Sequence, residues 1–380
     1  MSLYNAYREM RDYVYYSDFI PPNPILEPDF NEPTTSFKFI KDYFAAGGKE
    51  EAFSLGFEKE LKESEKNQHT VALYFLGLHL SKLVEGTLSN FLENNLKDTS
   101  WCNFKHTWFL TCLYHDTASV IETSAYKKET LGFFLGANNI YHNVYRHTPK
   151  SPDAQLLTFP EELVKNYFNY RIDYCNCVDH GILGGYLLFD RLKENYNTTW
   201  EKIKRQRIEA PALNEYKNEY KKFKYGNLTW RIEHLDLFAI IADSIIAHNI
   251  WFSHDDKLYC HYGLDPLIIS KTNKISLYDR PLLFFLSLLD TIEPVKCLTR
   301  KKLLTPVQAL KSVDIQIEND SKIVITRCLT DELYNNGPDS LNDLYKEWFD
   351  DIKKAEDWLD ISVFIEDDIT CTITIPPKKV

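Results

Sequence analysis

Apolar side chains recur every three or four residues through the middle of the chain, from about residue 36 to residue 300. The recurrence is clear in three stretches: Val71, Phe75 and Leu78; Phe109, Cys112 and Leu113; and Leu237, Ile240, Ile241 and Ile245. This spacing places the apolar side chains on one face of a helix. The pattern therefore predicts a bundle of amphipathic helices, with polar loops expected over residues 137–160 and 195–226.

The two ends of the chain carry different patterns. Residues 1–35 combine a short helical stretch with a group of prolines between Pro21 and Pro33, which is typical of an arm laid over the body. Beyond about residue 303, apolar and polar residues alternate over 312–318, 322–327, 361–366 and 370–375, which is typical of antiparallel strands. A helix is expected between the two pairs of strands, from Asp339 to about Leu359.

These patterns predict a mainly α fold in three parts. We expect an N-terminal arm and lead-in helices over residues 1–59, a helical domain over 60–302, and a small α+β C-terminal module over 303–380. Hydrophobic residues make up 44% of the 380 residues and charged residues 26%, which are the proportions of a folded globular protein.

The net charge of −11 narrows the class of partner. An acidic surface repels polyanions, so it favours a small phosphorylated molecule over nucleic acid. The N-terminus has no basic flank before an apolar core, and no apolar run approaches the roughly 20 residues that span a bilayer, so we expect a cytoplasmic protein without a membrane partner. The eight cysteines fit neither a disulfide framework nor paired zinc knuckles, and we interpret them as reduced thiols.

Histidine and aspartate residues stand on or beside the apolar faces of five predicted helices. They are His69, the pair His115 and Asp116, His180, His248, and Asp290. Burial of such side chains without a partner costs free energy, and a bound metal ion would offset that cost. One histidine on an apolar face is more often a core residue, but five such helices in series favour a metal site.

The order of these residues (His, His-Asp, His, His, Asp) resembles the HD-domain superfamily of metal-dependent phosphohydrolases. The resemblance covers about residues 60–300 and is strongest in Leu113–Ala118, Asp179–Gly181 and Leu288–Pro294. It implies that residues 60–302 form an HD-domain helical bundle. It also implies hydrolysis of a phosphoester or phosphoanhydride by a metal-activated hydroxide, with Asp116 as a catalytic residue and a nucleotide or cyclic nucleotide as the substrate.

The resemblance further implies how the metal ligands are divided. His69, His115, Asp116 and Asp290 would hold a first metal, and His180 and His248 would add a second metal bridged by Asp116. Imidazole and carboxylate ligands suit one or two divalent ions, and they leave the choice among Mn, Fe, Co, Ni, Zn and Mg open.

The chain departs from the family pattern after the His-Asp pair. Many members have a hydrophobic residue, Gly and Lys there, whereas this chain has Thr117, Ala118 and Ser119; His248 is followed by Asn249 where some members have paired histidines. We therefore expect other side chains to support the site. The candidates are Ser119 and Glu122 beyond the His-Asp pair; Asn249 beside His248; Asp179, Asp243 and Glu293 as hydrogen-bond partners of the ligands; and Arg146, His147, Lys150, Arg171 and Arg231 as phosphate-binding residues.

Two other functions stay open on the sequence. Basic and aromatic residues in 201–207 and 216–225 are compatible with an HD-type nuclease that acts on single-stranded nucleic acid. The missing lysine is compatible with a sensor or scaffold that binds a metal or a nucleotide without turnover. An enzyme would lose turnover but keep its fold in the Asp116→Ala variant, whereas a structural metal site would lose stability.

Overall fold

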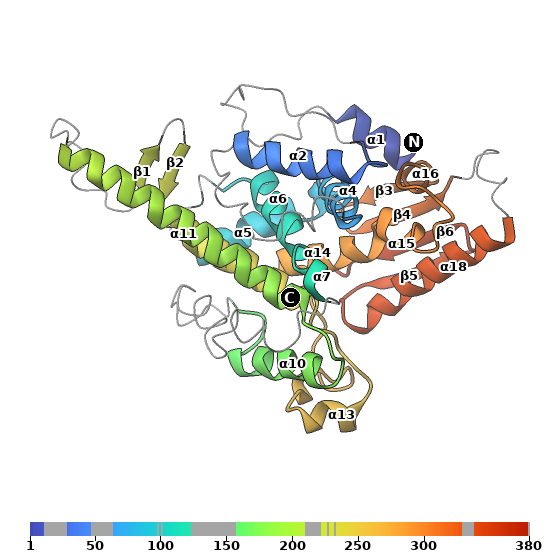
Figure 1. Cartoon of the computed structure of the whole chain (residues 1–380). Coiled ribbons are helices and arrows are strands. Elements are labelled where there is room, and N and C mark those ends of the chain that lie inside the picture. The colour runs from blue at the N-terminus through green and yellow to red at the C-terminus, as the bar shows by residue number, and fades with distance from the viewer. Residues whose placement is uncertain are drawn as a thin grey trace.

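The chain folds into a mainly helical structure with a small antiparallel sheet near its C-terminus (Figure 1). The computed structural model describes residues 1–10, 29–46, 64–96, 99, 102–122, 157–209, 222–225, 228–231, 233–328 and 338–378. The helices of the N-terminal and central parts are α1 (Leu3–Glu9), α2 (Pro33–Ala46), α4 (Lys66–His79), α5 (Glu85–Asn95), α6 (Phe104–His115), α7 (Ser119–Glu122), α10 (Glu161–Asp173), α11 (His180–Glu209), α12 (Glu233–His248), α13 (Asp256–His261), α14 (Pro281–Ile292), α15 (Pro294–Leu298) and α16 (Pro306–Lys311).

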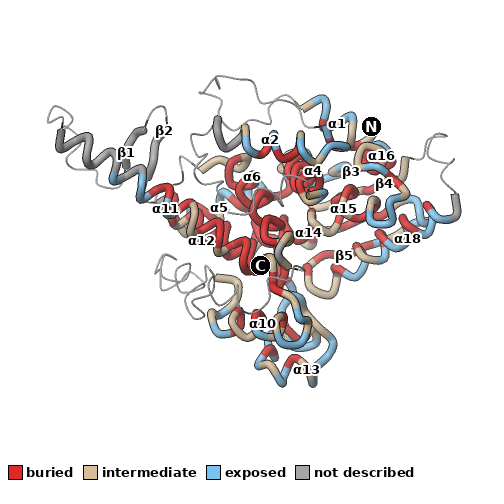
Figure 2. Tube along the Cα trace, in the orientation of Figure 1, coloured by how far each residue is buried: buried red, intermediate tan, exposed pale blue. Residues whose placement is uncertain are grey.

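Five of these helices, α4, α6, α11, α12 and α14, pack against one another and form the centre of the bundle. Their apolar faces carry most of the buried residues of the middle of the chain, as the red segments of Figure 2 show. The amphipathic spacing read from the sequence is confirmed here, because Val71, Phe109 and Leu237 are all buried. Helix α14 is buried on all sides through most of its length, which explains why it is so uniformly apolar.

Glycines at the start of α11 set the spacing of the central helices. A Cβ at Gly184 would lie 2.4 Å from the Tyr114 backbone oxygen of α6, and one at Gly185 would lie 2.5 Å from the Ala242 oxygen of α12. A Cβ at Gly181 would lie 2.7 Å from the Asn249 Cβ, just beyond α12. Because no side chain intervenes, the backbone of α11 approaches both neighbours closely. This contact places the start of α11 beside the ends of α6 and α12.

The prediction of a polar loop over residues 195–226 is wrong over its first part. Helix α11 continues to Glu209, and β1 (Lys222–Tyr225) then pairs antiparallel with β2 (Leu228–Arg231). The polar residues of this stretch do not interrupt the helix, because the backbone hydrogen bonds of a helix form whether or not the side chains are apolar. A run of polar residues indicates that the side chains are exposed, not that the helix has ended. Most of the other predicted loop, 137–160, lies outside the described residues.

The C-terminal part confirms the predicted strands and helix. Strands β3 (Val313–Asn319), β4 (Lys322–Arg327), β5 (Ser362–Glu366) and β6 (Thr370–Thr374) form an antiparallel sheet in the order β3-β4-β6-β5. Helix α18 (Pro338–Lys354) lies against it with a face made of Leu341, Leu344, Tyr345, Trp348, Phe349 and Ile352, all of which are buried. The period of three and four in this set is that of an amphipathic helix.

The hydrophobic core runs without a break from α1 through the bundle into the C-terminal sheet. Leu3 and Tyr7 of α1 are buried, and the Tyr7 hydroxyl donates a hydrogen bond to the Ala72 oxygen of α4 at 3.2 Å. On the other side, the Trp348 indole of α18 donates to the Thr291 oxygen of α14 at 3.4 Å. The three predicted parts therefore share one core, while the positions of their boundaries stay predictions. No helix in the described part of the chain has the length and apolar character needed to cross a membrane.

The close approach at Gly184 leads to a stability test. We expect Gly184→Ala to lower the free energy of unfolding by about 1–3 kcal/mol, because its methyl group would overlap backbone oxygen rather than a movable side chain. Gly86 in α5 is the matched control, since a Cβ there would have nothing within 4 Å and alanine favours helix at such a position by up to about 1 kcal/mol. Urea unfolding of both variants measures the difference; equal effects would contradict this account of helix spacing.

Candidate metal centre

Four histidines from four different helices share one hydrogen-bonding arrangement. Each directs its ring Nδ1 to an oxygen: His69 to Glu293 at 2.7 Å, His115 to the Cys112 carbonyl at 2.6 Å, His180 to Glu122 at 3.1 Å, and His248 to the Ile245 carbonyl at 2.5 Å. A carbonyl or carboxylate oxygen can only accept, so Nδ1 carries the hydrogen in each ring. When such a ring is neutral, its Nε2 atom is left as a lone-pair donor, which is the state that binds metal ions. Burial lowers the pKa of His69 and His180, but the carboxylates near both rings outweigh it and raise the pKa, so a metal ion would displace a proton there.

The first group of candidate ligands lies where α4, α6 and α14 meet. His69 Nε2 is 3.2 Å from His115 Nε2 and 3.0 Å from Asp290 Oδ1, and His115 Nε2 is 3.7 Å from the same Asp290 oxygen. Bonds of about 2.0–2.2 Å to one ion place neighbouring ligand atoms about 3.0–3.6 Å apart, depending on coordination number. The spacing of His69, His115 and Asp290 therefore fits a divalent cation.

Asp116 lies between this group and a second one. Its Oδ2 atom is 3.8 Å from the Nε2 atoms of both His69 and His115, and its Oδ1 atom is 3.3 Å from His180 Nε2. The ring of His248 lies 5.5 Å from that of His115 and 5.7 Å from that of His180, measured between centroids. The six residues predicted as ligands thus form one cluster. Within it, the buried residues His69, His115 and Asp116 already bring three ligand atoms close enough together to hold a metal ion.

The cluster strongly perturbs the pKa values of its members. Burial raises the pKa of Asp116, but the charges of His115 and Lys66 outweigh this effect and hold the pKa well below its usual value. Burial lowers the pKa of His248 to about 3, and the neighbouring His115 and His180 add to the decrease. Asp116 is therefore ionised and His248 neutral at pH 7, which are the protonation states of metal ligands.

Two lysines that the sequence analysis missed neutralise the carboxylates. Lys66 Nζ lies 2.8 Å from Asp116 Oδ2, and Lys296 Nζ lies 2.7 and 2.6 Å from the two oxygens of Asp290. Burial lowers the pKa of Lys296, but the charge of Asp290 outweighs it, so the pKa is raised. Lys66 carried a signal in the sequence, because it precedes His69 by three residues and so lies on the same helix face.

Glu293 combines two structural roles. Its side chain accepts hydrogen bonds from the backbone N–H groups of Val295 and Lys296 at 2.7 and 2.8 Å, which caps α15, and it also accepts from His69. Pro294 occupies the first turn of α15, where its missing N–H costs nothing. Helix capping and orientation of His69 therefore depend on one buried carboxylate, for which the sequence analysis predicted only the hydrogen bond to a ligand.

Glu122, Asp179 and Asn249 support His180 from the opposite side. Glu122 accepts from His180 and from Arg171 Nη2, the latter at 2.6 Å. Asn249 Nδ2 donates to Asp179 Oδ2 at 2.8 Å and lies 3.4 Å from His180 Nδ1, while Asp179 Oδ1 accepts from the Ile182 backbone at the start of α11. Arg171, predicted to bind phosphate, is instead buried in this network.

Two further candidates in the described part of the chain do not join the cluster, and the side chains of the others lie outside that part. Asp243 accepts hydrogen bonds from the backbone and the hydroxyl of Thr158, at 3.1 and 2.7 Å. The Ser119 hydroxyl is buried without a hydrogen-bond partner among the described residues. Arg146, His147 and Lys150 lie outside the described residues, as do the side chain of Arg231 and most side chains of the proposed strand-binding stretch.

Comparison of the chain with protein-family models, with curated proteins and with solved structures finds no match. The resemblance to HD-domain phosphohydrolases therefore stays a prediction. The geometry of the cluster is independent of that resemblance, since it follows from the distances between side chains in the structure.

Removal of the Glu293 charge tests whether the cluster binds metal through oriented histidines. We expect Glu293→Gln to weaken binding of Mn²⁺ or Zn²⁺ by about 10- to 100-fold, because His69 loses its carboxylate partner while the amide oxygen can still cap α15. Titration calorimetry on metal-stripped protein measures the affinity. Glu194→Gln, an exposed carboxylate paired with Arg191, is the control. Equal affinities in wild type and Glu293→Gln would contradict this role.

The buried Asp243 leads to a pH prediction. Burial raises its pKa to about 6, against which the Thr158 hydrogen bonds act only partly. The folded state then binds more protons than the unfolded state between about pH 4 and 6, so this group stabilises the fold below pH 4 and loses that contribution as pH rises through 6. We expect the stability of Asp243→Asn relative to wild type to increase by up to about 3 kcal/mol from pH 4 to pH 7. Urea unfolding across this range measures it, and a constant difference would refute it.

Proposed function

We propose that this chain is a metal-dependent phosphohydrolase of the HD type, acting on a phosphoester or phosphoanhydride of a small molecule such as a nucleotide. The observation that carries the proposal is the set of four histidines whose Nδ1 atoms are all held by oxygens, around two carboxylates that face them. A core packed for stability alone has no need of this repeated tautomer, whereas metal binding through Nε2 does require it.

The residues divide into two candidate ligand groups around Asp116. His69, His115 and Asp290 would hold one ion together with the Oδ2 atom of Asp116. His180 and His248 would hold another ion together with the Oδ1 atom of Asp116. Divalent ions in such a site activate water and neutralise charge on a phosphoryl group. The protein contributes a buried, fixed donor set, because each histidine is held by a second hydrogen bond and each carboxylate by a lysine.

Asp116 is the residue on which hydrolysis should depend most, since its two carboxylate oxygens face the two groups. We expect Asp116→Asn to reduce hydrolysis of bis-p-nitrophenyl phosphate by at least about 100-fold, in assays supplemented with Mn, Ni, Co, Mg or Zn. Its amide keeps the shape of the carboxylate but removes the charge that binds metal. Metal content per chain is measured on the same samples, and far-ultraviolet circular dichroism establishes that the fold is retained.

A matched exposed aspartate, Asp256→Asn, serves as the control and should retain wild-type turnover. Metal bound to wild type without hydrolysis of this substrate or of a nucleotide panel would favour the sensor or scaffold function instead. Absence of bound metal under every loading condition would contradict the proposal as a whole.

A further inference from the structure

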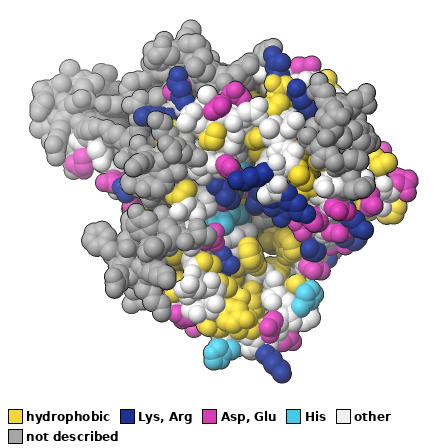
Figure 3. All heavy atoms as spheres, turned by 45° about the vertical axis from the view of Figure 1, so that its right-hand side comes forward, with side chains coloured by type: hydrophobic (Ala, Val, Ile, Leu, Met, Phe, Trp, Pro, Cys, Tyr) yellow, Lys and Arg dark blue, Asp and Glu magenta, His cyan; other side chains and the backbone are white. Residues whose placement is uncertain are grey.

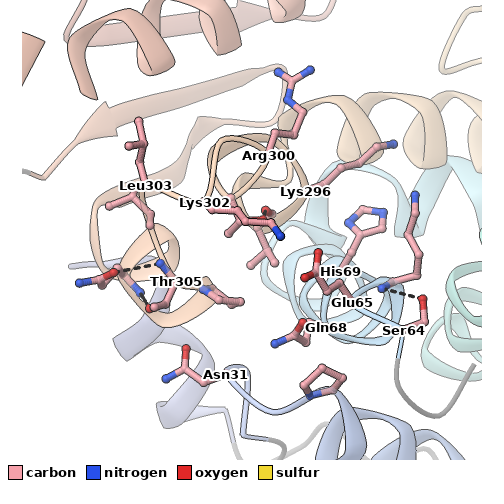
Figure 4. Close-up of a pocket in the computed structure, with 17 residues that line it drawn as sticks. Asn31, Ser64, Glu65, Gln68, His69, Lys296, Arg300, Lys302, Leu303 and Thr305 are labelled. Carbon is pink, nitrogen blue, oxygen red and sulfur yellow. Dashed lines mark hydrogen bonds between the residues drawn. The ribbon is translucent and has the colours of Figure 1, made fainter. Parts of the chain in front are cut away.

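A basic cleft opens beside the candidate metal centre. It has a volume of about 1040 Å³ and lies between the start of α4, the segment at Asn31 and Pro33, and the turn from α15 to α16. His69 lies in its wall, so the cleft reaches the metal-binding cluster directly (Figure 4). Among the described residues that line it, Lys66, Lys296, Arg300 and Lys302 are basic and only Glu65 is acidic.

This local charge is opposite to that of the whole chain, whose net charge is −11. Figure 3 shows Lys and Arg side chains gathered beside a hollow in which histidine is visible. A concave site lined mainly by basic side chains concentrates small anions once those side chains are released from their carboxylate partners, while the acidic surroundings repel extended polyanions. The cleft therefore suits a compact anion better than a long nucleic acid.

Lys66 and Lys296 are placed to exchange partners. Both are now paired with candidate metal ligands, Asp116 and Asp290, yet their side chains retain exposed fractions of 40% and 36% in the cleft. If these carboxylates coordinated a cation, both ammonium groups would lose their partners and would be available to an anion. Lys66 of α4 and Lys296 of α15 would then supply the positive charge that many HD-domain members carry on a lysine shortly after the His-Asp pair.

Lys302 differs from its neighbours in the same turn. Lys301 is paired with Glu347 at 2.6 Å and Arg300 with Asp351 at 3.0 Å, and Arg300 points away from the cleft in Figure 4. Lys302 is exposed and has no ion-pair partner among the described residues, and its side chain extends toward the His69 end in that view. Its backbone adopts φ of 56°, a conformation that this residue type uses rarely. An exposed cation without an ion-pair partner in the described part of the chain suits a ligand phosphate.

We infer that the cleft binds a compact substrate with two or more phosphate groups, a refinement that rests on the proposed function. Lys66 and Lys296 contact the phosphate at the metal centre, and Lys302 contacts a phosphate farther along the cleft. The shared chemistry is a cluster of neighbouring phosphates, which is present in inorganic tripolyphosphate, in a nucleoside triphosphate and in an inositol polyphosphate. A substrate with a single phosphate leaves Lys302 unused.

Titration calorimetry on the full chain loaded with Mn²⁺ or Zn²⁺ and freed of excess metal tests the cleft with Lys66 and Lys296 released from Asp116 and Asp290. The same titration on metal-stripped protein isolates the contribution of Lys302. We expect inorganic tripolyphosphate to bind at least tenfold more tightly than orthophosphate, and Lys302→Asn to weaken tripolyphosphate binding by about tenfold. Asparagine removes the charge and tolerates the positive φ, so the fold is preserved. Lys301→Asn, the adjacent lysine paired on the other side, is the matched control and should bind within twofold of wild type.

Further arms identify the source of the phosphates. Tighter binding of a nucleoside triphosphate than of tripolyphosphate would assign part of the site to the nucleoside, whereas tighter binding of inositol hexakisphosphate would assign it to separate phosphomonoesters. Lys302→Arg, which keeps the charge, should retain most of the affinity. Equal affinity for tripolyphosphate and orthophosphate, or equal losses in Lys302→Asn and Lys301→Asn, would overturn the inference.

The two hypotheses fail in different ways. Lys302-dependent binding of tripolyphosphate without hydrolysis of any phosphate ester would preserve the cleft assignment and contradict the proposed function. Asp116-dependent hydrolysis of bis-p-nitrophenyl phosphate, together with no preference for tripolyphosphate in binding or in kcat/KM, would preserve the function and contradict the cleft assignment.

Discussion

The arrangement of most of this structure depends on one constraint, the burial of charged side chains at the centre of the helical bundle. Asp116 is almost fully buried, and His69, His115 and Glu293 are buried with it. An isolated carboxylate in such a place would be neutralised by protonation or would destabilise the fold. Here the charge of Lys66 and the nearby imidazoles keep the pKa of Asp116 low, so the negative charge persists inside the protein. Retaining that charge is costly for stability, and a buried charge of this kind suits a site that binds a cation.

Helix ends are the places where this cluster is assembled. His115 ends α6 and His248 ends α12, and each donates its Nδ1–H to the carbonyl three residues earlier in its own helix. The last carbonyls of a helix have no intrahelical partner, so they are available to a side chain at no cost to the helix. The same reasoning applies to Glu293 at the start of α15, whose carboxylate accepts from two free backbone N–H groups and from His69. Local helix chemistry thus fixes the tautomers that the centre requires.

The C-terminal sheet is packed against the part of the bundle that carries the site. Helix α18 contacts α14 and α15, which supply Asp290 and Lys296, and the Trp348 indole bonds to the backbone next to Asp290. On the opposite side, Gly184 lets α11 approach α6 beside His115. Both contacts limit the movement of helices relative to one another, and a rigid frame holds ligand atoms at distances that suit a metal ion.

The sequence by itself determined the mainly helical character, the C-terminal strands with their helix, and the identity of the clustered residues. Periodicity determines these because a helix or strand with one buried face must repeat its apolar residues with the period of its backbone, and a polar residue on such a face is detectable at once. The tertiary structure alone decided that α11 continues to Glu209, that Arg171 is engaged by Glu122, and that Lys66 and Lys296 face the carboxylates. Lys66 shares a helix face with His69, but only the packing of α4 against α6 brings its charge to Asp116. The turn from α14 into α15 brings Lys296 to Asp290. Ion pairing across helices depends on distance in space, which the spacing of residues along one chain does not encode.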